Sequence, residues 1–218
     1  MIGSAALAML PRGLMGAAKT PPGPRTELWF SKPAERWMEA LPIGNGRIGG
    51  MVFGGTSTER IALTESTLWS GAPSDRNIDP MAFENLDRIR NLMFAENYVE
   101  GGQLCKQYLL GRPESFGTNL PLVDLEVAFD EGGAAQNYRR SLDLDEAIAH
   151  VDYARGGLRF HREIFSSNPD DVLVVRLTCS HARSVSCGIS FGKLRLPGDV
   201  TTEGNDTLIL RGHAFEPM

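Results

Sequence analysis

Apolar and polar residues alternate along most of the chain from Glu27 onward, in short runs separated by glycine, asparagine and aspartate. Because successive side chains of an extended strand point to opposite faces, this alternation predicts strands with one buried face. A turn at residues 54–57 joins the first two clear runs and predicts a β-hairpin. The clearest runs are RIGGMVFGG (47–55), RIALTES (60–66), LVDLEVAF (122–129) and DTLILRG (206–212).

More strands are predicted in the second half of the chain. Residues 138–167 contain three of them, with Gly156 and Gly157 as the turn between the second and the third. The run DVLVVRLTC (171–179) is almost continuously apolar, as expected of a strand buried on both faces. SVSCGISFGKL (184–194) supplies one more. Short strands at this spacing are typical of an antiparallel β-sandwich.

The apolar period changes between residues 79 and 111, where it becomes helical. Asp79 followed by Pro80 is a good N-cap and first position for a helix that starts there. A second helix is predicted from Tyr98 to Leu110, although Gly101 and Gly102 weaken it. The fold class predicted is therefore mainly β: an antiparallel β-sandwich with a helical insertion around residues 80–110. The apolar residues that set the helical period are Phe83, Leu86, Ile89, Leu92 and Met93.

The first 24 residues differ from the rest, because they are small and apolar and then rich in proline. Pro11 and Arg12 interrupt the apolar run, which is too short to span a bilayer. Two interpretations remain open: a remnant of a signal peptide, which implies a secreted or periplasmic protein, or a disordered tail. Residues 25–218 are expected to form one β-sandwich domain that is incomplete at its C-terminal end, and localisation stays unknown.

Composition narrows the classes of partner. The 218 residues carry a net charge of −5, and lysine and arginine are scattered without a basic run. This argues against a nucleic-acid partner and against an anionic membrane surface. Cys105, Cys179 and Cys187 form no metal-binding pair, so buried free thiols are expected. A disulfide between Cys179 and Cys187 is the alternative if the compartment is oxidising.

No catalytic or metal-binding pattern is evident in the sequence. GNGRIGG (44–50) lacks the residues of a phosphate-binding loop and continues as a strand, so it is no nucleotide fingerprint. The four histidines show no ligand spacing, and neither a metal nor a cofactor is expected. Paired carboxyl groups are expected at strand edges and turns, and spacing alone cannot make them catalytic. These pairs are Glu59 with Glu65, Asp143 with Asp145 and Glu146, and Asp170 with Asp171.

Long segments of the chain nevertheless resemble one known family. LWFSKPAERWMEALPIGNGRIGGMVFGG (28–55), then ERIALTESTLWSG (59–71), is similar to the start of the family 95 glycoside hydrolases, the α-L-fucosidases. The order of later segments supports the resemblance, which runs from about Glu27 to Leu177. Two departures are Leu122-Val123-Asp124-Leu125, which lacks the usual glycine, and Thr64-Glu65, which replaces the usual Asn-Glu. The later segments include NLDRIRNLMFAENYVEG (85–101), YRRSLDLDEAIAHVDY (138–153) and LRFHREIFSSNPDDVLVVRL (158–177).

The resemblance implies an N-terminal, non-catalytic β-sandwich domain of an enzyme that hydrolyses terminal α-L-fucosyl linkages with inversion. In that family the catalytic residues lie in an (α/α)6 barrel, so none of them can be assigned to this chain, and activity of the chain alone is doubtful. Expected partners are a fucosylated oligosaccharide or polysaccharide and the barrel domain. Two alternatives stay open: a stand-alone carbohydrate-binding module and an inactive gene fragment.

Four residues of the glycine-rich hairpin are candidates for the rim of the sugar pocket or for an interdomain contact: Asn45, Arg47, Glu65 and Trp69. Asn45 and Arg47 are expected to donate hydrogen bonds to sugar hydroxyls, and Trp69 to offer a flat face to a sugar ring or to a barrel helix. Glu65 is expected to hold Arg47 by a charge-assisted hydrogen bond. The alternative is that all four only fix the hairpin and the interdomain seam.

Overall fold

The computed structural model describes residues 26–70, 79–110, 117–130, 133–194 and 197–214. These residues fall into two compact units, which are taken separately here. The first unit holds 26–68 and 120–213, and the second holds the residues between 69 and 119 together with Ala214. The predicted leader, residues 1–24, lies outside the described residues.

The first sheet has five antiparallel strands in the order β1-β6-β7-β8-β9. Gly156 and Gly157, with φ angles of 57° and 78°, form the tight turn between β7 and β8 that the sequence predicts. Its strands are β1 (Glu27–Phe30), β6 (Gln136–Asp143), β7 (Ile148–Arg155), β8 (Leu158–Ser167) and β9 (Val172–Cys179).

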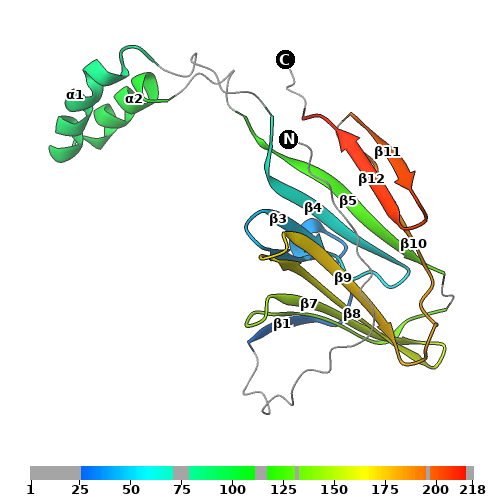
Figure 1. The fold of residues 1–218 in the computed structure, drawn as a ribbon. Coiled ribbons are helices and arrows are strands. Elements are labelled where there is room, and N and C mark those ends of the chain that lie inside the picture. The colour runs from blue at the N-terminus through cyan, green and yellow to red at the C-terminus, as the bar shows by residue number, and fades with distance from the viewer. Residues whose placement is uncertain (1–25, 71–78, 111–116, 131–132, 195–196, 215–218) are drawn as a thin grey trace. The chain divides into compact units, whose positions relative to one another are not determined.

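The second sheet also has five strands, in the order β10-β5-β4-β3-β2. Its strands are β2 (Leu41–Gly44), β3 (Ile48–Val52), β4 (Thr58–Trp69), β5 (Asn119–Phe129) and β10 (Cys187–Phe191). A short 3-10 helix, η1 (Trp37–Glu39), precedes β2, and β11 (Gly198–Glu203) pairs with β12 (Thr207–Gly212) as a separate hairpin. Figure 1 shows β3, β4 and β5 in one layer and β7, β8 and β9 in the other.

The core lies between the two sheets. Ile61 of β4 and Ile164 of β8 have no exposed surface, and both belong to one apolar cluster. Burying such side chains from two faces drives the sheets together, and the predicted β-sandwich is confirmed. The cluster comprises Leu41, Ile43, Val52 and Ile61 from the second sheet and Leu142, Ala149 and Ile164 from the first.

The predicted helical insertion is also confirmed, as α1 (Ala82–Phe94) and α2 (Tyr98–Tyr108). The helix begins at Ala82 with Met81 as its N-cap, so the predicted cap at Asp79 was wrong; Asp79 instead forms a turn before the helix, in which its carboxylate accepts from the Met81 amide at 2.8 Å and its carbonyl from the Ala82 amide at 3.0 Å. Gly101 does not break α2, since its missing side chain makes room for Met93 of α1. None of the described helices is long and apolar enough to cross a membrane.

The insertion leaves and re-enters the sheet at one place. The Ser70 amide donates to the Thr118 carbonyl at 2.9 Å, and the Thr118 amide donates to the Ser70 hydroxyl at 3.0 Å. These two hydrogen bonds join Ser70, which follows β4, to Thr118, which precedes β5, so the segment between them begins and ends at the same place.

Three predictions from the sequence, two about strands and one about the cysteines, were wrong or incomplete. The run at 171–179 is β9, which lies at the edge of the first sheet and has no fully buried residue, so the expected burial on both faces was wrong. Inward-facing Leu173 and Val175 contact the core from this edge. The strands β2 and β11 were not predicted separately. The three cysteines are free and only partly buried, and Cys179 and Cys187 lie in different sheets.

The glycine-rich stretch serves the sandwich itself. Gly46, with a φ angle of 93°, lies in the turn between β2 and β3, where other residues are strained. A side chain at Gly50 would place its Cβ 2.9 Å from Ile61 Cγ2 and 3.2 Å from Leu173 Cδ1 of the opposite sheet. The sheets therefore approach each other at a position that only glycine fits.

A buried ion pair crosses the sandwich at one end of the apolar core. Glu59 of β4 and Arg162 of β8 are 0% and 2% exposed, and Arg162 Nη1 donates to Glu59 Oε2 at 2.5 Å. The other oxygen accepts from the amides of Gly54 at 2.7 Å and Arg60 at 3.1 Å. Burial raises the pKa of Glu59, and the charge of Arg162 and these hydrogen bonds oppose the rise. Glu59 was expected at a strand edge, and that expectation was wrong.

Arg140 of β6 is a second buried arginine, with 2% of its surface exposed. Its Nε donates to the carbonyl of Lys32 at 2.8 Å and its Nη1 to the carbonyl of Glu39 at 2.8 Å. The guanidinium also lies 4.2 Å from the centre of the Phe30 ring. Arg140 therefore holds the segment between β1 and β2 against the first sheet.

Candidate functional site

The turn between β2 and β3 is built around Asn45. Its side-chain oxygen accepts hydrogen bonds from the amides of Arg47 at 2.9 Å and Ile48 at 2.8 Å. An asparagine that caps amides two and three residues ahead stabilises a tight turn. Its amide nitrogen donates to the Ser167 carbonyl at 2.7 Å, so Asn45 also ties this turn to the turn between β8 and β9.

Arg47 lies at the tip of the same turn and is paired with two carboxylates. Its Nε donates to Glu65 Oε1 at 3.2 Å, and its Nη1 is paired with Asp171. The hydrogen bond to Glu65, followed by that to Asp171, raises the pKa of Arg47. We refer to Asn45, Arg47, Glu65 and Asp171 as the tip cluster. The contact between Arg47 and Glu65 is the one expected from the sequence, whereas the contact with Asp171 was not foreseen.

Glu65 is held in its ionised form. Burial alone would raise the pKa of Glu65, but hydrogen bonds from the Thr67 hydroxyl at 2.6 Å and the Thr67 amide at 2.8 Å lower it, together with Arg47. Of the donors predicted to face a sugar, the Asn45 amide group is therefore engaged within the fold, while the Arg47 side chain is 56% exposed.

Trp69 is the last residue of β4 and belongs to the second compact unit, so the tip cluster does not include it. The residue is 51% exposed. A half-exposed indole at the end of a strand offers an apolar face for packing or stacking. Its role as a pocket-rim residue stays a prediction, as do the roles of Asn45, Arg47 and Glu65.

Replacing Arg47 with methionine is expected to destabilise the domain only slightly at neutral pH, because the ion pairs of the tip cluster are partly exposed. The lowered pKa of Glu65 means that its contribution is present above the usual carboxyl pKa and is lost as the pH falls through the lowered value. Urea unfolding at several pH values should therefore show the difference between variant and wild type shrinking in acid. A Glu65 carboxyl that titrates identically in both proteins by NMR would contradict the prediction.

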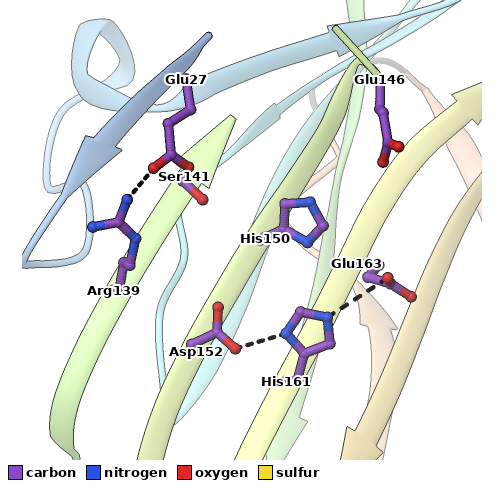
Figure 2. Close-up of a pocket in the computed structure, with 8 residues that line it drawn as sticks. All are labelled: Glu27, Arg139, Ser141, Glu146, His150, Asp152, His161 and Glu163. Carbon is purple, nitrogen blue, oxygen red and sulfur yellow. Dashed lines mark hydrogen bonds and ion pairs between the residues drawn. The ribbon is translucent and has the colours of Figure 1, made fainter. Parts of the chain in front are cut away.

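A shallow polar pocket of about 510 Å³ lies on the outer face of the first sheet, away from the core. Figure 2 shows its side chains projecting from β1, β6, β7 and β8 toward a common space. Four of the lining residues are acidic and one is an arginine, so the pocket is negatively charged at neutral pH. The lining residues are Glu27, Arg139, Ser141, Glu146, His150, Asp152, His161 and Glu163.

His161 stands at the centre of this pocket, between two carboxyl groups (Figure 2). Its Nδ1 lies 2.7 Å from Asp152 Oδ1, and its Nε2 lies 3.6 Å from Glu163 Oε1. The ring of His150 stacks on that of His161 with the ring centres 5.5 Å apart. Burial alone would raise the pKa of Glu163, but the hydrogen bond and charge of Arg176 lower it, with help from His161.

Sequence reasoning missed this pocket although a signal was present. The spacings His150-x-Asp152 and His161-x-Glu163 place each pair on one face of a strand. The tight turn at Gly156-Gly157 makes the two strands neighbours, and the register then sets His150 opposite Glu163 and Asp152 opposite His161. Cross-strand partners of this kind are close together, so a search across the predicted hairpin would have found the group.

Comparison with known proteins gives a consistent result. Residues 28–217 match the family model described as glycosyl hydrolase family 65, N-terminal domain. The chain is 34% identical over 189 residues to alpha-L-fucosidase 2 of Arabidopsis thaliana, and the matched region covers 85% of this chain and 22% of that protein. It is 31% identical over 140 residues to a protein named "Probable alpha-fucosidase A" of Aspergillus niger, covering 64% of this chain and 18% of that protein. The chain thus spans about a fifth of the length of these relatives, and the expected resemblance to α-L-fucosidases is confirmed.

Proposed function

We infer the function from the premise that this chain belongs to the family described as glycosyl hydrolase family 65, N-terminal domain, with α-L-fucosidases among its relatives. We propose that it is the non-catalytic β-sandwich domain of an enzyme that hydrolyses terminal α-L-fucosyl linkages with inversion. The domain would pack on a catalytic barrel and border its active site, and the substrate would be a fucosylated oligosaccharide or polysaccharide. The observation that carries the proposal is the family match over residues 28–217.

The chemistry of the polar pocket supports a non-catalytic role. An inverting glycosidase needs one carboxylic acid that stays protonated until it protonates the leaving group, and a carboxylate that activates water. In the pocket, Glu27 is paired with Arg139, and Glu163 is paired with Arg176, which lowers its pKa. Asp152 is hydrogen-bonded to His161. A carboxyl group held by an arginine, as Glu163 is, is a poor general acid, because the cation stabilises its ionised form.

The tip cluster and Trp69 are the residues we propose to border the active site. Arg47 keeps half of its side chain exposed while two carboxylates fix its position, which suits a donor presented to a sugar hydroxyl. The exposed face of Trp69 suits stacking on a sugar ring or on a neighbouring domain.

A chimera tests this proposal. Residues 28–217 replace the matching segment of the Arabidopsis thaliana relative, and hydrolysis of an aryl α-L-fucoside and of a fucosylated oligosaccharide is measured. We expect Trp69→Ala to raise KM for the oligosaccharide about 10-fold, since stacking on an aromatic ring is worth about 1 kcal/mol or more. Trp37→Ala is the matched control, because Trp37 is equally exposed, at 55%, and lies in η1.

Several outcomes would contradict the proposal. If Trp69→Ala and Trp37→Ala changed KM for the oligosaccharide equally, Trp69 would have no specific contact with the substrate. Turnover of the aryl fucoside by the purified chain alone would show that it is catalytic. Saturable binding of fucosylated oligosaccharides to the free chain, abolished by Trp69→Ala, would favour a carbohydrate-binding module instead.

A further inference from the structure

We propose that His150, His161 and Glu163 bind a divalent transition-metal ion of the Zn²⁺ class on the outer face of the first sheet. Each residue offers one ligand atom, and these three atoms lie within 4.8 Å of one another. The site is independent of the proposed function, and it would stand if the fucosidase role were wrong.

The register of β7 and β8 holds the three residues together. His150 is directly opposite Glu163, and His161 is opposite Asp152, one pair further along the same face. Zinc bonds of about 2.0–2.1 Å with tetrahedral angles place ligand atoms roughly 3.4 Å apart. Because all three side chains are only partly buried, rotations about their χ angles can close the remaining gap of up to about 1.4 Å.

His161 is oriented as metal-binding histidines are. Nδ1 of His161 lies 2.7 Å from Asp152 Oδ1, and this contact holds the ring with its other nitrogen directed away from Asp152. Nε2 is the ring atom that faces Glu163, at 3.6 Å from its Oε1 (Figure 2). A carboxylate behind a histidine fixes both its tautomer and its ring orientation toward a metal.

His150 supplies an independent observation. Its Nε2 is buried and has no hydrogen-bond partner among the described residues. Leaving a buried polar nitrogen unpaired costs about 1–3 kcal/mol, so folded proteins rarely do so without a reason. A metal ion bound to this nitrogen, in the plane of the His150 ring, would satisfy it.

The charge around the cluster favours a cation. Arg176 occupies one oxygen of Glu163, donating to Oε2 at 2.7 Å, and Oε1 is the atom on the side of His161. The positive charge of Arg176 is offset by the acidic lining of the pocket, where Arg139 is already paired with Glu27. A dication therefore enters a pocket of net negative charge.

The types of ligand determine which metal ion the site prefers. Two imidazoles and one carboxylate suit Zn²⁺ and leave a fourth position for water, whereas Mg²⁺ and Ca²⁺ prefer oxygen ligands alone. The order of affinities expected for other divalent ions is that of imidazole sites in general, with Cu²⁺ and Zn²⁺ above Co²⁺.

Calorimetric titration of the whole, untagged chain with ZnCl₂ tests the site. We expect one ion per chain, a Zn²⁺-dependent rise in Tm, and no response to MgCl₂ or CaCl₂. Binding of Co²⁺ should give the visible absorption of a tetrahedral complex. His161→Ala and His150→Ala should weaken Zn²⁺ binding at least 10-fold, and Asp152→Asn about 10- to 100-fold, because Asp152 orients a ligand without binding the ion.

His181→Ala is the matched control, since His181 is exposed and lies outside the pocket. It should bind Zn²⁺ as the wild type does, and circular dichroism should show that every variant is folded. Should a variant fail to fold, NMR of the wild type decides, because Zn²⁺ should shift the ring signals of His150 and His161 and not those of His181. Absence of Zn²⁺ binding, or equal binding by His161→Ala and the wild type, would overturn the proposal.

Discussion

Replacing Glu59 with glutamine is expected to lower the free energy of unfolding by about 3–5 kcal/mol. The substitution keeps the size of the side chain but removes the charge that faces Arg162 at 2.5 Å in a site without solvent exposure. The Nε and Nη2 atoms of Arg162 are already buried without a hydrogen-bond partner in the described structure, so the remaining cation would keep only its contacts with the rings of Phe129 and Tyr153. Urea unfolding followed by circular dichroism measures the change.

The control for Glu59→Gln is Asp124→Asn, which breaks the nearby ion pair of Asp124 with Arg60. That pair is partly exposed, with 22% and 37% of the two side chains accessible, so its loss should cost at most about 1 kcal/mol. The double variant Glu59→Gln, Arg162→Met should recover part of the lost stability, because it leaves no unpaired buried charge. Equal effects of Glu59→Gln and Asp124→Asn would show that the buried pair has no special role.

Arg140→Met should destabilise the domain by about 3 kcal/mol, since it removes hydrogen bonds from a charged donor to two carbonyl groups and leaves both unsatisfied. The contact with the Phe30 ring is lost as well. Because these carbonyls belong to Lys32 and Glu39, amide hydrogen exchange should rise in the segment between β1 and β2 more than in the core strands.

Arg139→Met offers a control at the adjacent position. Arg139 points to the outer face of the same strand, is 41% exposed and pairs with Glu27, so its replacement should cost at most about 1 kcal/mol. Similar destabilisation by Arg139→Met and Arg140→Met would contradict the prediction, because it would mean that the inward-facing arginine contributes no more stability than the outward-facing one.

The fold was largely predictable because local patterns determine it. Alternation gave the strands, and turn residues such as Gly156 and Gly157 gave the tight connection between β7 and β8. The place of each strand in its sheet was not predictable in this way. The apolar run of β9 suggested a strand buried on both faces, yet none of its residues is fully buried and β9 lies at a sheet edge, because the order of strands depends on contacts between distant segments.

The buried polar residues were the least predictable part of the core. In the sequence, Glu59 resembles any carboxylate residue of a strand. Its burial could be anticipated only by knowing that it pairs with Arg162, which comes from the other sheet. The same limit applies to the tip cluster. Arg47, in the turn between β2 and β3, is paired with Glu65 of β4 as expected, while Asp171 reaches Arg47 from the turn between β8 and β9.

The two hydrogen bonds between Ser70 and Thr118 make the helix pair a self-contained excursion from the second sheet. The free energy of closing a loop depends only weakly on its length. The segment from 71 to 117 can therefore be lengthened, shortened or exchanged in the course of evolution with little penalty to the sandwich. Related domains are free to vary in size and sequence at this junction while the strands on either side keep their register.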